Sequence, residues 1–455
     1  MRTLWPPSRW LNRHRRRVRM NRERLSLTAF MPQPTGGALV GGAVRDALLG
    51  RPSRDWDWAV DDPAAEARAL AAQVEGDAFA LDEARGHWRV VQGDRTFDFV
   101  PVDGDLMANL QARDFTVNAM ALTAEGLVDP HGGLADLTQG VLRQVSDGAL
   151  LDDPVRGVRG VRLAALLGLE WDTLTRAAAQ DVAAEIASGR LAMPAMERIR
   201  DELTAILFGP TPGDAILDLH RMGWLQHVLP VMVEGEGVAQ GSLHHLDVLE
   251  HQCDALQRLV TAFPDAPLEV RLATLMHDVG KPACRSLEGG RAWFEGHATI
   301  GAEQTTQALR RLRYSAAVVA RASELVGRHM VRLPDSSRSA RRFAYRYRHL
   351  LPGLLHLMLA DREAARGRAA SKAGRDRYRQ AVARVVSELE ALPDAPPLLG
   401  GEDVMRLLNV TPGPWVGEAL RFVAESRAVG DVASREEAER ALHAWWDVQQ
   451  HRWPS

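Results

Sequence analysis

The sequence predicts an α/β N-terminal part followed by a long, mostly helical remainder. In residues 31–150, short apolar runs alternate with turn-forming residues, which is the pattern of strands and tight connections. From Asp152 onward the chain is rich in Ala, Leu, Arg and Glu, and breakers gather at a few turns. The 455 residues are too many for one hydrophobic core, so two to four domains are expected.

The strands and one helix of the α/β part can be placed by their patterns. The apolar run 38–40 and the run 56–60 predict strands, and the run 63–74 predicts a helix. Two hairpins are expected, one joining 87–91 to 96–102 around Gly93-Asp94 and one joining 118–122 to 127–128 around Glu125-Gly126.

Two breaks divide the helical remainder. A glycine-rich segment covers 234–241, and a proline-rich segment covers 392–397. We therefore expect a basic, disordered extension at 1–30 and an α/β head at 31–150. Two helical domains follow at 151–240 and 241–391, and a helical tail covers 392–455. The extension lacks an apolar core region, so it is not a secretory signal.

Composition excludes some functions and leaves others open. No apolar run approaches the roughly 20 residues needed to span a bilayer. Cys253 and Cys284 are the only cysteines, which gives no disulfide framework and predicts a reducing cytoplasm. The net charge of −3 does not indicate a nucleic-acid binder, but arginines cluster at 13–24, 338–348 and 362–379. Each cluster fits phosphate contacts or a solvated helix face equally well.

The most informative motif is Gly41-Gly42-Ala43-Val44-Arg45-Asp46, followed by Asp55-Trp56-Asp57. The two glycines allow a tight turn with close backbone approach, and a helix starting there favours a phosphate. Period-2 geometry places Asp55 and Asp57 on one face of a strand. Paired carboxylates suit Mg²⁺ bound to substrate phosphates, so the motif predicts nucleotidyl transfer by metal ions.

In this order and spacing the motifs resemble the class II nucleotidyltransferases of the polymerase-beta superfamily, which comprise tRNA CCA-adding enzymes and bacterial poly(A) polymerases. The resemblance implies a polymerase-beta-like head, a helical neck and body that bind nucleobase and RNA, and an RNA-binding tail at 392–455. Arg113-Asp114-Phe115-Thr116-Val117-Asn118 resembles the second motif, where Arg113 reaches the triphosphate and Asp114 and Asn118 hold the ribose. Gly42 and Arg45 join this nucleotide site, and Asp98 is a candidate third carboxylate.

The segment Asp152-Asp153-Pro154-Val155-Arg156 predicts the start of a helix, with Asp152 as its N-cap. Asp153 can accept from the exocyclic amine of C or A, and Arg156 can donate to the ring acceptors. The segment resembles the family's protein template for choosing CTP and ATP. The resemblance implies that Arg159 and Arg162 face the triphosphate or base, and that the segment from Glu197 to Leu203 is structural.

A second constellation lies in the helical region. The ordered set His251, His277-Asp278 and Asp361 resembles the HD phosphohydrolase domain, which implies that these four residues bind a divalent metal. His297 and His329 are candidates for a second metal or for phosphate. Two alternatives stay open, a phosphohydrolase acting on RNA ends and a helical domain that kept its histidines without activity.

The resemblance leaves three enzymes as alternatives and, as a fourth, a non-catalytic RNA-binding module or HD hydrolase with an inactive head. Intact Asp55 and Asp57 disfavour the last, and the absence of an Arg-Arg-Phe signature from 84–89 disfavours a poly(A) polymerase. CCA-adding relatives carry an Arg- and Gly-containing loop before the second motif, and here Val102 leads through Asp103-Gly104 almost directly into 105–112. We therefore expect addition of CC to tRNA from CTP, beside a separate A-adding enzyme, with full CCA addition from CTP and ATP as the alternative.

Overall fold

The computed structural model describes residues 36–102, 105–289, 291–392, 396–449 and 451. The expected extension 1–30 lies outside these residues. The chain divides into two compact units, an N-terminal unit that ends at Val233 and a C-terminal unit that begins at Glu234, with Arg311–Arg313 assigned to the N-terminal unit. Within the described residues, no helix combines the length and the apolar character needed to cross a bilayer.

The N-terminal unit begins with a seven-stranded sheet in the order β3-β4-β5-β2-β1-β6-β7. All neighbouring strands are antiparallel except β2 and β5, which run parallel. The strands of this sheet are β1 (Ala38–Val40), β2 (Asp55–Val60), β3 (Asp77–Asp82), β4 (His87–Gln92), β5 (Arg95–Pro101), β6 (Ala121–Thr123) and β7 (Gly126–Val128).

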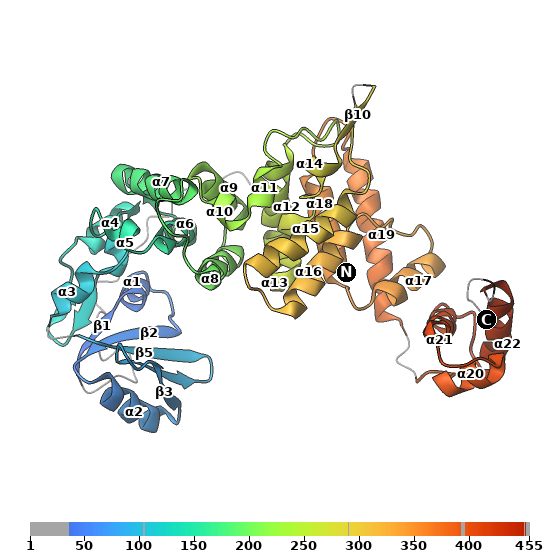
Figure 1. Cartoon of the computed structure of the whole chain (residues 1–455), viewed down its shortest axis with the longest axis horizontal. Helices are drawn as coiled ribbons and strands as arrows, with labels where there is room; N and C mark the ends of the chain where they lie inside the picture. Colours follow the sequence, from blue (N-terminus) through green and yellow to red (C-terminus); the bar gives the residue numbers. More distant parts are fainter. Residues whose placement is uncertain (1–35, 103–104, 290, 393–395, 450, 452–455) are drawn as a thin grey trace. The chain divides into compact units, whose positions relative to one another are not determined.

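Helices cover the two faces of the sheet unequally (Figure 1). Helix α2 (Pro63–Val74) packs on β3, β4 and β5, where Val90, Phe97 and Phe99 form a buried layer. Helix α1 (Gly42–Leu48) packs against β1 and β2 on the other face. Among the described residues no other helix packs extensively on β3 or β4, so that part of the second face stays open.

The rest of the N-terminal unit is helical apart from two short strands. Its remaining helices are α3 (Leu106–Gln111), the 3-10 turn η3 (Thr116–Asn118), α4 (Gly133–Gln139), α5 (Ala149–Asp152), α6 (Val155–Leu167), α7 (Thr173–Ala187), α8 (Met196–Leu207), α9 (Pro212–Arg221), α10 (Leu225–Val228) and α11 (Pro230–Val233). Strands β8 (Val141–Leu142) and β9 (Glu170–Trp171) pair beside α6. Gly157 and Gly160 of α6 let the helix approach Trp224 and Trp171, because a Cβ at either glycine would collide with an indole ring.

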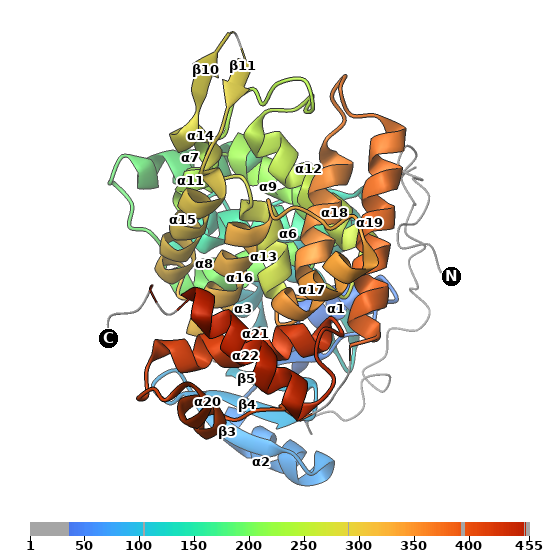
Figure 2. The ribbon, with the colours of Figure 1, turned by 90° about the vertical axis from the view of Figure 1, so that its right-hand side faces the viewer.

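The C-terminal unit is a helical assembly with one hairpin. Its helices are α12 (Val248–Ala262), α13 (Leu268–Met276), α14 (Lys281–Cys284), α15 (His297–Arg311), α16 (Ala316–Arg328), α17 (Ser337–Tyr347), α18 (Gly353–Ala364), α19 (Lys372–Glu390), α20 (Gly401–Leu408), α21 (Pro414–Ala428) and α22 (Arg435–Gln449). Helices α12, α13 and α18 pack together, and Figure 2 shows the hairpin of β10 (Ser286–Glu288) and β11 (Arg291–Trp293) extending beyond them.

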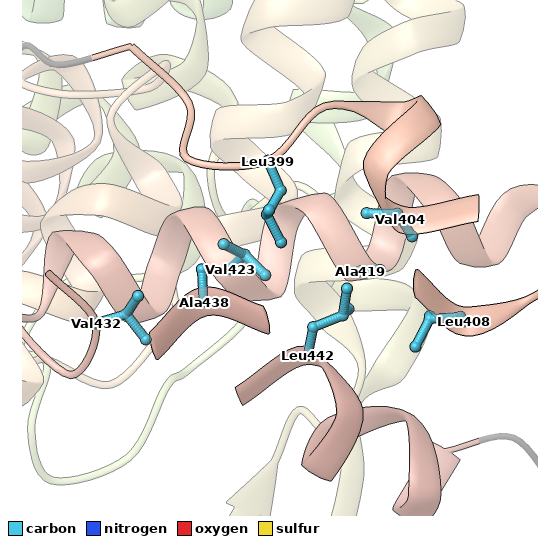
Figure 3. Close-up of a cluster of buried hydrophobic side chains, with 8 residues drawn as sticks. All are labelled: Leu399, Val404, Leu408, Ala419, Val423, Val432, Ala438 and Leu442. Carbon is cyan, nitrogen blue, oxygen red and sulfur yellow. The ribbon is translucent and has the colours of Figure 1, made fainter. Parts of the chain in front are cut away.

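The last three helices have a small core of their own (Figure 3). Val404 of α20, Val423 of α21 and Leu442 of α22 meet there, and Trp445 packs against them from the edge. Asn409, in the left-handed conformation, ends α20, and Pro414 stands in the first turn of α21. Helix α19 ends at Glu390 and α20 begins at Gly401, and residues 393–395 of the expected proline-rich break lie outside the described residues.

The expected mixed head and helical remainder are confirmed, and one local prediction is wrong. Asp152 is the last residue of α5 and does not cap a helix. Helix α6 starts at Val155 after Pro154, with no side-chain cap, because Asp153 between the two helices is extended and its carboxylate binds elsewhere. The proline ring fits this start because its missing N–H would have no partner in a first turn.

Candidate active sites

The nucleotide motifs meet in one cavity of the N-terminal unit. The cavity has a volume of about 450 Å³ and a polar lining. It gathers ten of the residues expected at this site, namely Gly42, Arg45, Asp55, Asp57, Arg113, Asp114, Asn118, Arg156, Arg159 and Arg162. Asp153 and Asp98 do not line it, although each touches the surrounding network.

Strand β2 carries the paired carboxylates to the centre of the sheet. Asp57 stands opposite Val40 of β1 and Asp98 of β5, and Asp55 stands opposite Thr96. Burial raises the pKa of Asp57; nearby Arg113 lowers it, and the neighbouring charges of Asp98 and Asp55 raise it further. This excess of negative charge at the cavity fits a divalent cation, which hard carboxylate oxygens bind well.

The turn before α1 brings backbone next to the carboxylates. Gly41 has φ 77°, a conformation that glycine adopts without strain. A Cβ at Gly41 would collide with the guanidinium of Arg113 and lie 3.2 Å from Oδ2 of Asp57. The backbone conformation therefore favours glycine, and any larger residue would also displace the guanidinium of Arg113 from its place beside Asp57.

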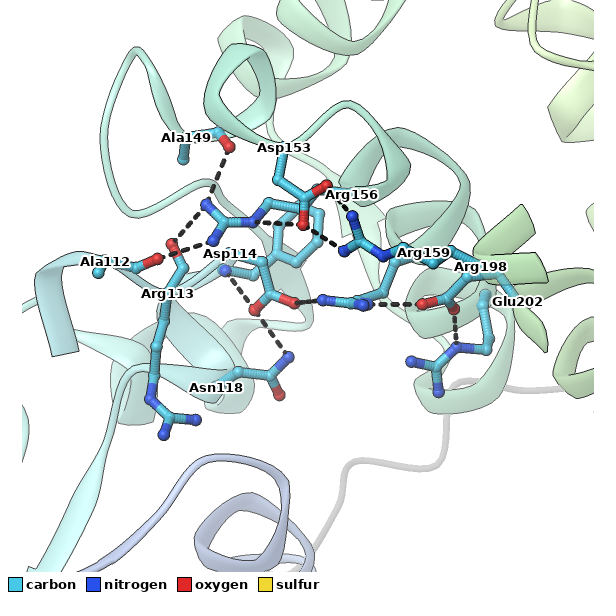
Figure 4. A network of polar contacts seen from close by, with 12 residues as sticks. Ala112, Arg113, Asp114, Asn118, Ala149, Asp153, Arg156, Arg159, Arg198 and Glu202 are labelled. Carbon is cyan, nitrogen blue, oxygen red and sulfur yellow. Dashed lines mark hydrogen bonds and ion pairs between the residues drawn. The ribbon is translucent and has the colours of Figure 1, made fainter. Parts of the chain in front are cut away.

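A chain of polar contacts links the head to helices α6 and α8 (Figure 4). Buried Arg45 donates to Oδ1 of Asn118 at 2.5 Å, and Asn118 donates to Asp114 at 3.0 Å. Arg159 of α6 donates to Asp114 at 3.2 Å and to Oε1 of Glu202 at 2.6 Å. Burial alone would lower the pKa of Arg159, but the carboxylates of Glu202 and Asp114 raise it above its ordinary value.

Glu202 has a larger part in this network than the sequence indicates. It is 7% exposed and also accepts from Nε of Arg162 at 2.6 Å, so one carboxylate holds both arginines. A signal was present, because Glu202 shares a face of α8 with buried Ile199 and Leu203. An acidic residue on the apolar side of an amphipathic helix indicates a buried charged partner.

The expected base-selecting pair is held from two sides (Figure 4). Arg198 of α8 donates to both carboxylate oxygens of Asp153, at 2.9 and 2.6 Å, whereas Nε of Arg156 lies 3.8 Å from Asp153. Arg156 instead donates to the backbone oxygens of Ala112 at 2.7 Å and Ala149 at 2.9 Å. The position of Arg198 was not predictable, since an arginine on an amphipathic helix carries no specific signal.

Asp98 is engaged by an arginine. The guanidinium of Arg89 on β4 donates to both oxygens of Asp98, each at 2.6 Å. Asp98 nevertheless lies on the same face of the sheet as Asp57, with which it pairs in register. Within the described part of the chain, Asp55 and Asp57 accept no hydrogen bond from an arginine, whereas Asp98 is neutralised by Arg89.

The second constellation assembles in the C-terminal unit as two groups of three ligands. His251, His277 and Asp361 form one group, and Asp278, His297 and His329 form the other, with the ligand atoms of each group within 4.8 Å of one another. Five of the six residues are buried and Asp361 is intermediate.

Asp278 stands between the two groups. Its Oδ2 lies 3.1 Å from Nε2 of His277 and 3.6 Å from that of His251. Its Oδ1 lies 3.5 Å from Nε2 of His297 and 3.6 Å from that of His329. The single carboxylate can therefore contribute one oxygen to each group.

The histidine rings are oriented for metal binding. Nδ1 lies within hydrogen-bond distance of a backbone oxygen in three of them, at 2.9 Å for His277 and 2.7 Å for both His297 and His329, which directs Nε2 toward the centre. Nε2 of His277 is buried and lies 3.1 Å from Oδ2 of Asp278 and 3.7 Å from Oδ1 of Asp361. Burial raises the pKa of Asp361, but hydrogen bonds from His251 and His277 hold it well below its usual range. Neutral imidazoles and anionic carboxylates are the ligand set of a divalent metal.

Two residues beside this constellation were not expected from the sequence. Lys281 donates to Oδ2 of Asp278 and to Oε1 of Gln240, each at 2.6 Å. The ring of His244 meets that of His251 edge-on, with centroids 4.5 Å apart. Lys281 follows the His-Asp pair by three residues on the same turn, so spacing could have indicated it, whereas His244 comes from an irregular loop.

Comparisons with known proteins match the segments of the chain that carry these residues. The sequence matches the family described as "Poly A polymerase head domain" over 38–103 and 91–143, "Probable RNA and SrmB- binding site of polymerase A" over 172–234, and "HD domain" over 240–366. Among solved structures, the Bacillus stearothermophilus CCA-adding enzyme in complex with CTP is similar in fold, with a TM-score of 0.62 and 22% identity, covering 91% of this chain and 95% of that one.

Two curated relatives are similar over almost their whole length. The A-adding tRNA nucleotidyltransferase of Deinococcus radiodurans is 53% identical over 419 residues, which cover 91% of this chain and 96% of the relative. The CC-adding tRNA nucleotidyltransferase of Thermus thermophilus is 42% identical over 408 residues, which cover 89% and 93%. The chain therefore belongs to the class II tRNA nucleotidyltransferases with an HD domain, and it is a nucleotidyltransferase enzyme.

Proposed function

We propose that the chain transfers nucleotides from nucleoside triphosphates to the 3′ hydroxyl of tRNA, with Asp55 and Asp57 holding Mg²⁺. The observation that carries this proposal is one cavity that gathers the carboxylate pair with eight other charged side chains from four motifs. When bound, Mg²⁺ activates the hydroxyl and neutralises the leaving pyrophosphate. The family's use of divalent metals and the raised pKa of Asp57 both support this assignment.

The side chains of the cavity have separate tasks in the proposal. Arg113 lies next to Gly41 and Asp57, where its charge can hold a triphosphate oriented toward the metal-binding carboxylates. Asp114 and Asn118 also line the cavity, and in the proposal they hold the ribose of the nucleotide by hydrogen bonds. Arg159 and Arg162, fixed by Glu202, line the wall toward α8, where their guanidinium groups can donate to phosphate oxygens.

We propose addition of the terminal A as the specific reaction, because the A-adding relative is 53% identical over nearly its whole length. Addition of CC is the second candidate, and the short connection between β5 and α3 favours it. Strand β5 ends at Pro101 and α3 begins at Leu106, while Asp103 and Gly104 lie outside the described residues. Because this chain is similar to a CC-adding relative as well, at 42% identity, the comparisons leave both specificities open.

A primer-extension assay separates the candidates. An A-adding enzyme should extend tRNA ending in CC by one residue from ATP and leave tRNA lacking CCA unchanged with CTP. A CC-adding enzyme should extend tRNA lacking CCA by two residues and stop, even with ATP present. Extension by three residues would support full CCA addition instead. If no tRNA is extended, the proposed function as a whole is contradicted.

Asp153→Ala and Arg156→Ala should each relax the choice of base more than they weaken binding of triphosphate. Loss of a contact that distinguishes the base should reduce discrimination against GTP and UTP by roughly 1–3 kcal/mol. The readout is kcat/KM for each of the four nucleotides. Asp152→Ala is the matched control, because this neighbouring carboxylate is exposed and ends α5. Unchanged rejection of GTP and UTP by both variants would disprove the base-selecting role.

For the HD domain we propose a metal-dependent phosphohydrolase that acts on phosphoesters at RNA ends. The two ligand groups that share Asp278 support it. Bound metal supplies an activated water, and the buried ammonium of Lys281 lies beside Asp278, where it can interact with a phosphate oxygen.

A further inference from the structure

Edge strand β3 presents its large apolar side chains to solvent. Phe79 is 44% exposed and Leu81 is 46% exposed. The small residues Ala78 and Ala80 take the alternate positions and face α2, because they stand opposite Val90 and Trp88 of β4, and Trp88 contacts Arg68 of α2. The strand is therefore inverted relative to an ordinary half-buried strand, whose large apolar residues face the core.

The register of the sheet connects this exposed ring to the carboxylates. Phe79 stands opposite Arg89, Arg89 opposite Asp98, and Asp98 opposite Asp57. Directly opposite residues point to the same face, so the four side chains form one row across four strands. Three spacings of about 4.8 Å place Phe79 roughly 14 Å from Asp57.

The row changes in character along its length. At one end Asp57 and Asp55 line the nucleotide cavity, and Asp98 follows, neutralised by two hydrogen bonds from Arg89. The Arg89 side chain is 35% exposed, and beyond it lies the exposed ring of Phe79. An exposed aromatic ring is a platform on which a base of single-stranded nucleic acid stacks. The exposed part of Arg89, whose charge is compensated by Asp98, lies beside the ring and can still donate to a backbone oxygen.

We propose that Phe79, Leu81 and Arg89, here called the β3 platform, bind the unpaired 3′ nucleotides of tRNA upstream of the reacting hydroxyl, with a base stacked on Phe79. The proposal rests on the proposed nucleotide addition. Continuity with the cavity identifies the occupant, since a 3′ end that reaches Asp57 must leave the cavity across a neighbouring surface. A stacked strand rises about 3.4 Å per nucleotide, so the ring is within reach of the last few residues.

Phe79→Ala should raise KM for tRNA about 5- to 100-fold, which is the effect of losing one base–aromatic stack. KM for the nucleoside triphosphate should not change, because the ring is outside the cavity lining. Phe79→Trp should restore tRNA affinity, since stacking requires only an aromatic face. The melting temperature should stay that of the parent because the ring is already exposed. Leu287→Ala, which truncates an exposed leucine of β10, is the matched control.

A binding experiment without catalysis distinguishes this inference from the proposed function. An RNA minihelix with 2-aminopurine in its unpaired 3′ end should change fluorescence on binding the parent protein and Phe79→Trp, but not Phe79→Ala. An active parent enzyme whose KM and fluorescence are indifferent to Phe79→Ala would overturn the β3 platform alone. Loss of a parental dimer in Phe79→Ala, with unchanged KM for tRNA, would also overturn it and assign the strand to self-association. An inactive parent enzyme that still shows the Phe79-dependent fluorescence change would contradict only the proposed function.

Discussion

Replacing Asp57 by asparagine is expected to reduce nucleotide addition by at least about a hundredfold. Divalent metal contributes several kcal/mol of charge stabilisation to phosphoryl transfer, and a neutral amide is a poor ligand for it. The fold should tolerate the change, because burial already raises the pKa of Asp57 and the isosteric amide carries no charge to desolvate. Single-turnover extension of tRNA and thermal melting measure the two effects.

Asp55→Ala should give the same loss, and Asp61→Ala is the control. Asp61 follows the same strand and is exposed like Asp55, but it does not line the nucleotide cavity. Binding of tRNA should persist in all three variants, since none of them removes a basic side chain. If Asp57→Asn and Asp55→Ala both retained more than a few per cent of activity, the carboxylate pair would not be the metal site.

The second large effect concerns the HD domain. The double variant His277→Ala with Asp278→Ala should eliminate metal-dependent hydrolysis of a 2′,3′-cyclic phosphate and leave nucleotide addition at the parental rate. Asp278 contributes an oxygen to each ligand group, so its loss disables both. The assay uses purified protein stripped of metal and then supplied with Mg²⁺, Mn²⁺, Co²⁺ or Ni²⁺ separately.

Two further proteins keep this prediction testable if the double variant is unstable. Asp361→Asn keeps a hydrogen-bonding side chain at a partly exposed position and should abolish hydrolysis alone. His443→Ala, at an exposed position of α22, should leave both activities unchanged. A parent protein with no hydrolysis under any metal would support the alternative that the domain kept its histidines without activity. Equal loss of both reactions in Asp361→Asn would contradict two independent sites.

The sequence predicts the strands that carry the site better than the strand at the edge of the sheet. Strands β1 and β2 and the hairpin of β4 and β5 follow from apolar runs bounded by glycine and charged turns. Strand β3 was not predicted, because its small and large apolar residues are exchanged between the two faces. The alanines face α2, whereas Phe79 and Leu81 face solvent. A period-2 pattern that keeps its large residues in solvent does not signal burial.

In the candidate sites, local motifs predicted residue types and neighbourhood but not pairing. The chain brings Arg45, Asp57 and Arg113 into one cavity, as their motifs indicate. Which acid binds which arginine depends on helices α6 and α8 meeting, and this long-range contact has no local pattern. The sequence therefore predicted that Arg159 faces the triphosphate or base but did not predict that Glu202 binds it.

The contacts of Arg156 have a consequence for fidelity. Its guanidinium donates to the backbone oxygens of Ala112 and Arg113, and the side chain of Arg113 reaches past Gly41 to Asp57. On the proposed base-selecting role, a correct base draws Arg156 from these oxygens and so changes what holds the peptide that carries Arg113, whereas a mismatched base leaves Arg156 in place. Rejection of a wrong nucleotide would then be kinetic as well as energetic, because the chemistry is slow when a bound base leaves Arg113 unadjusted. Substitutions at Arg156 and Arg113 should accordingly be non-additive in kcat.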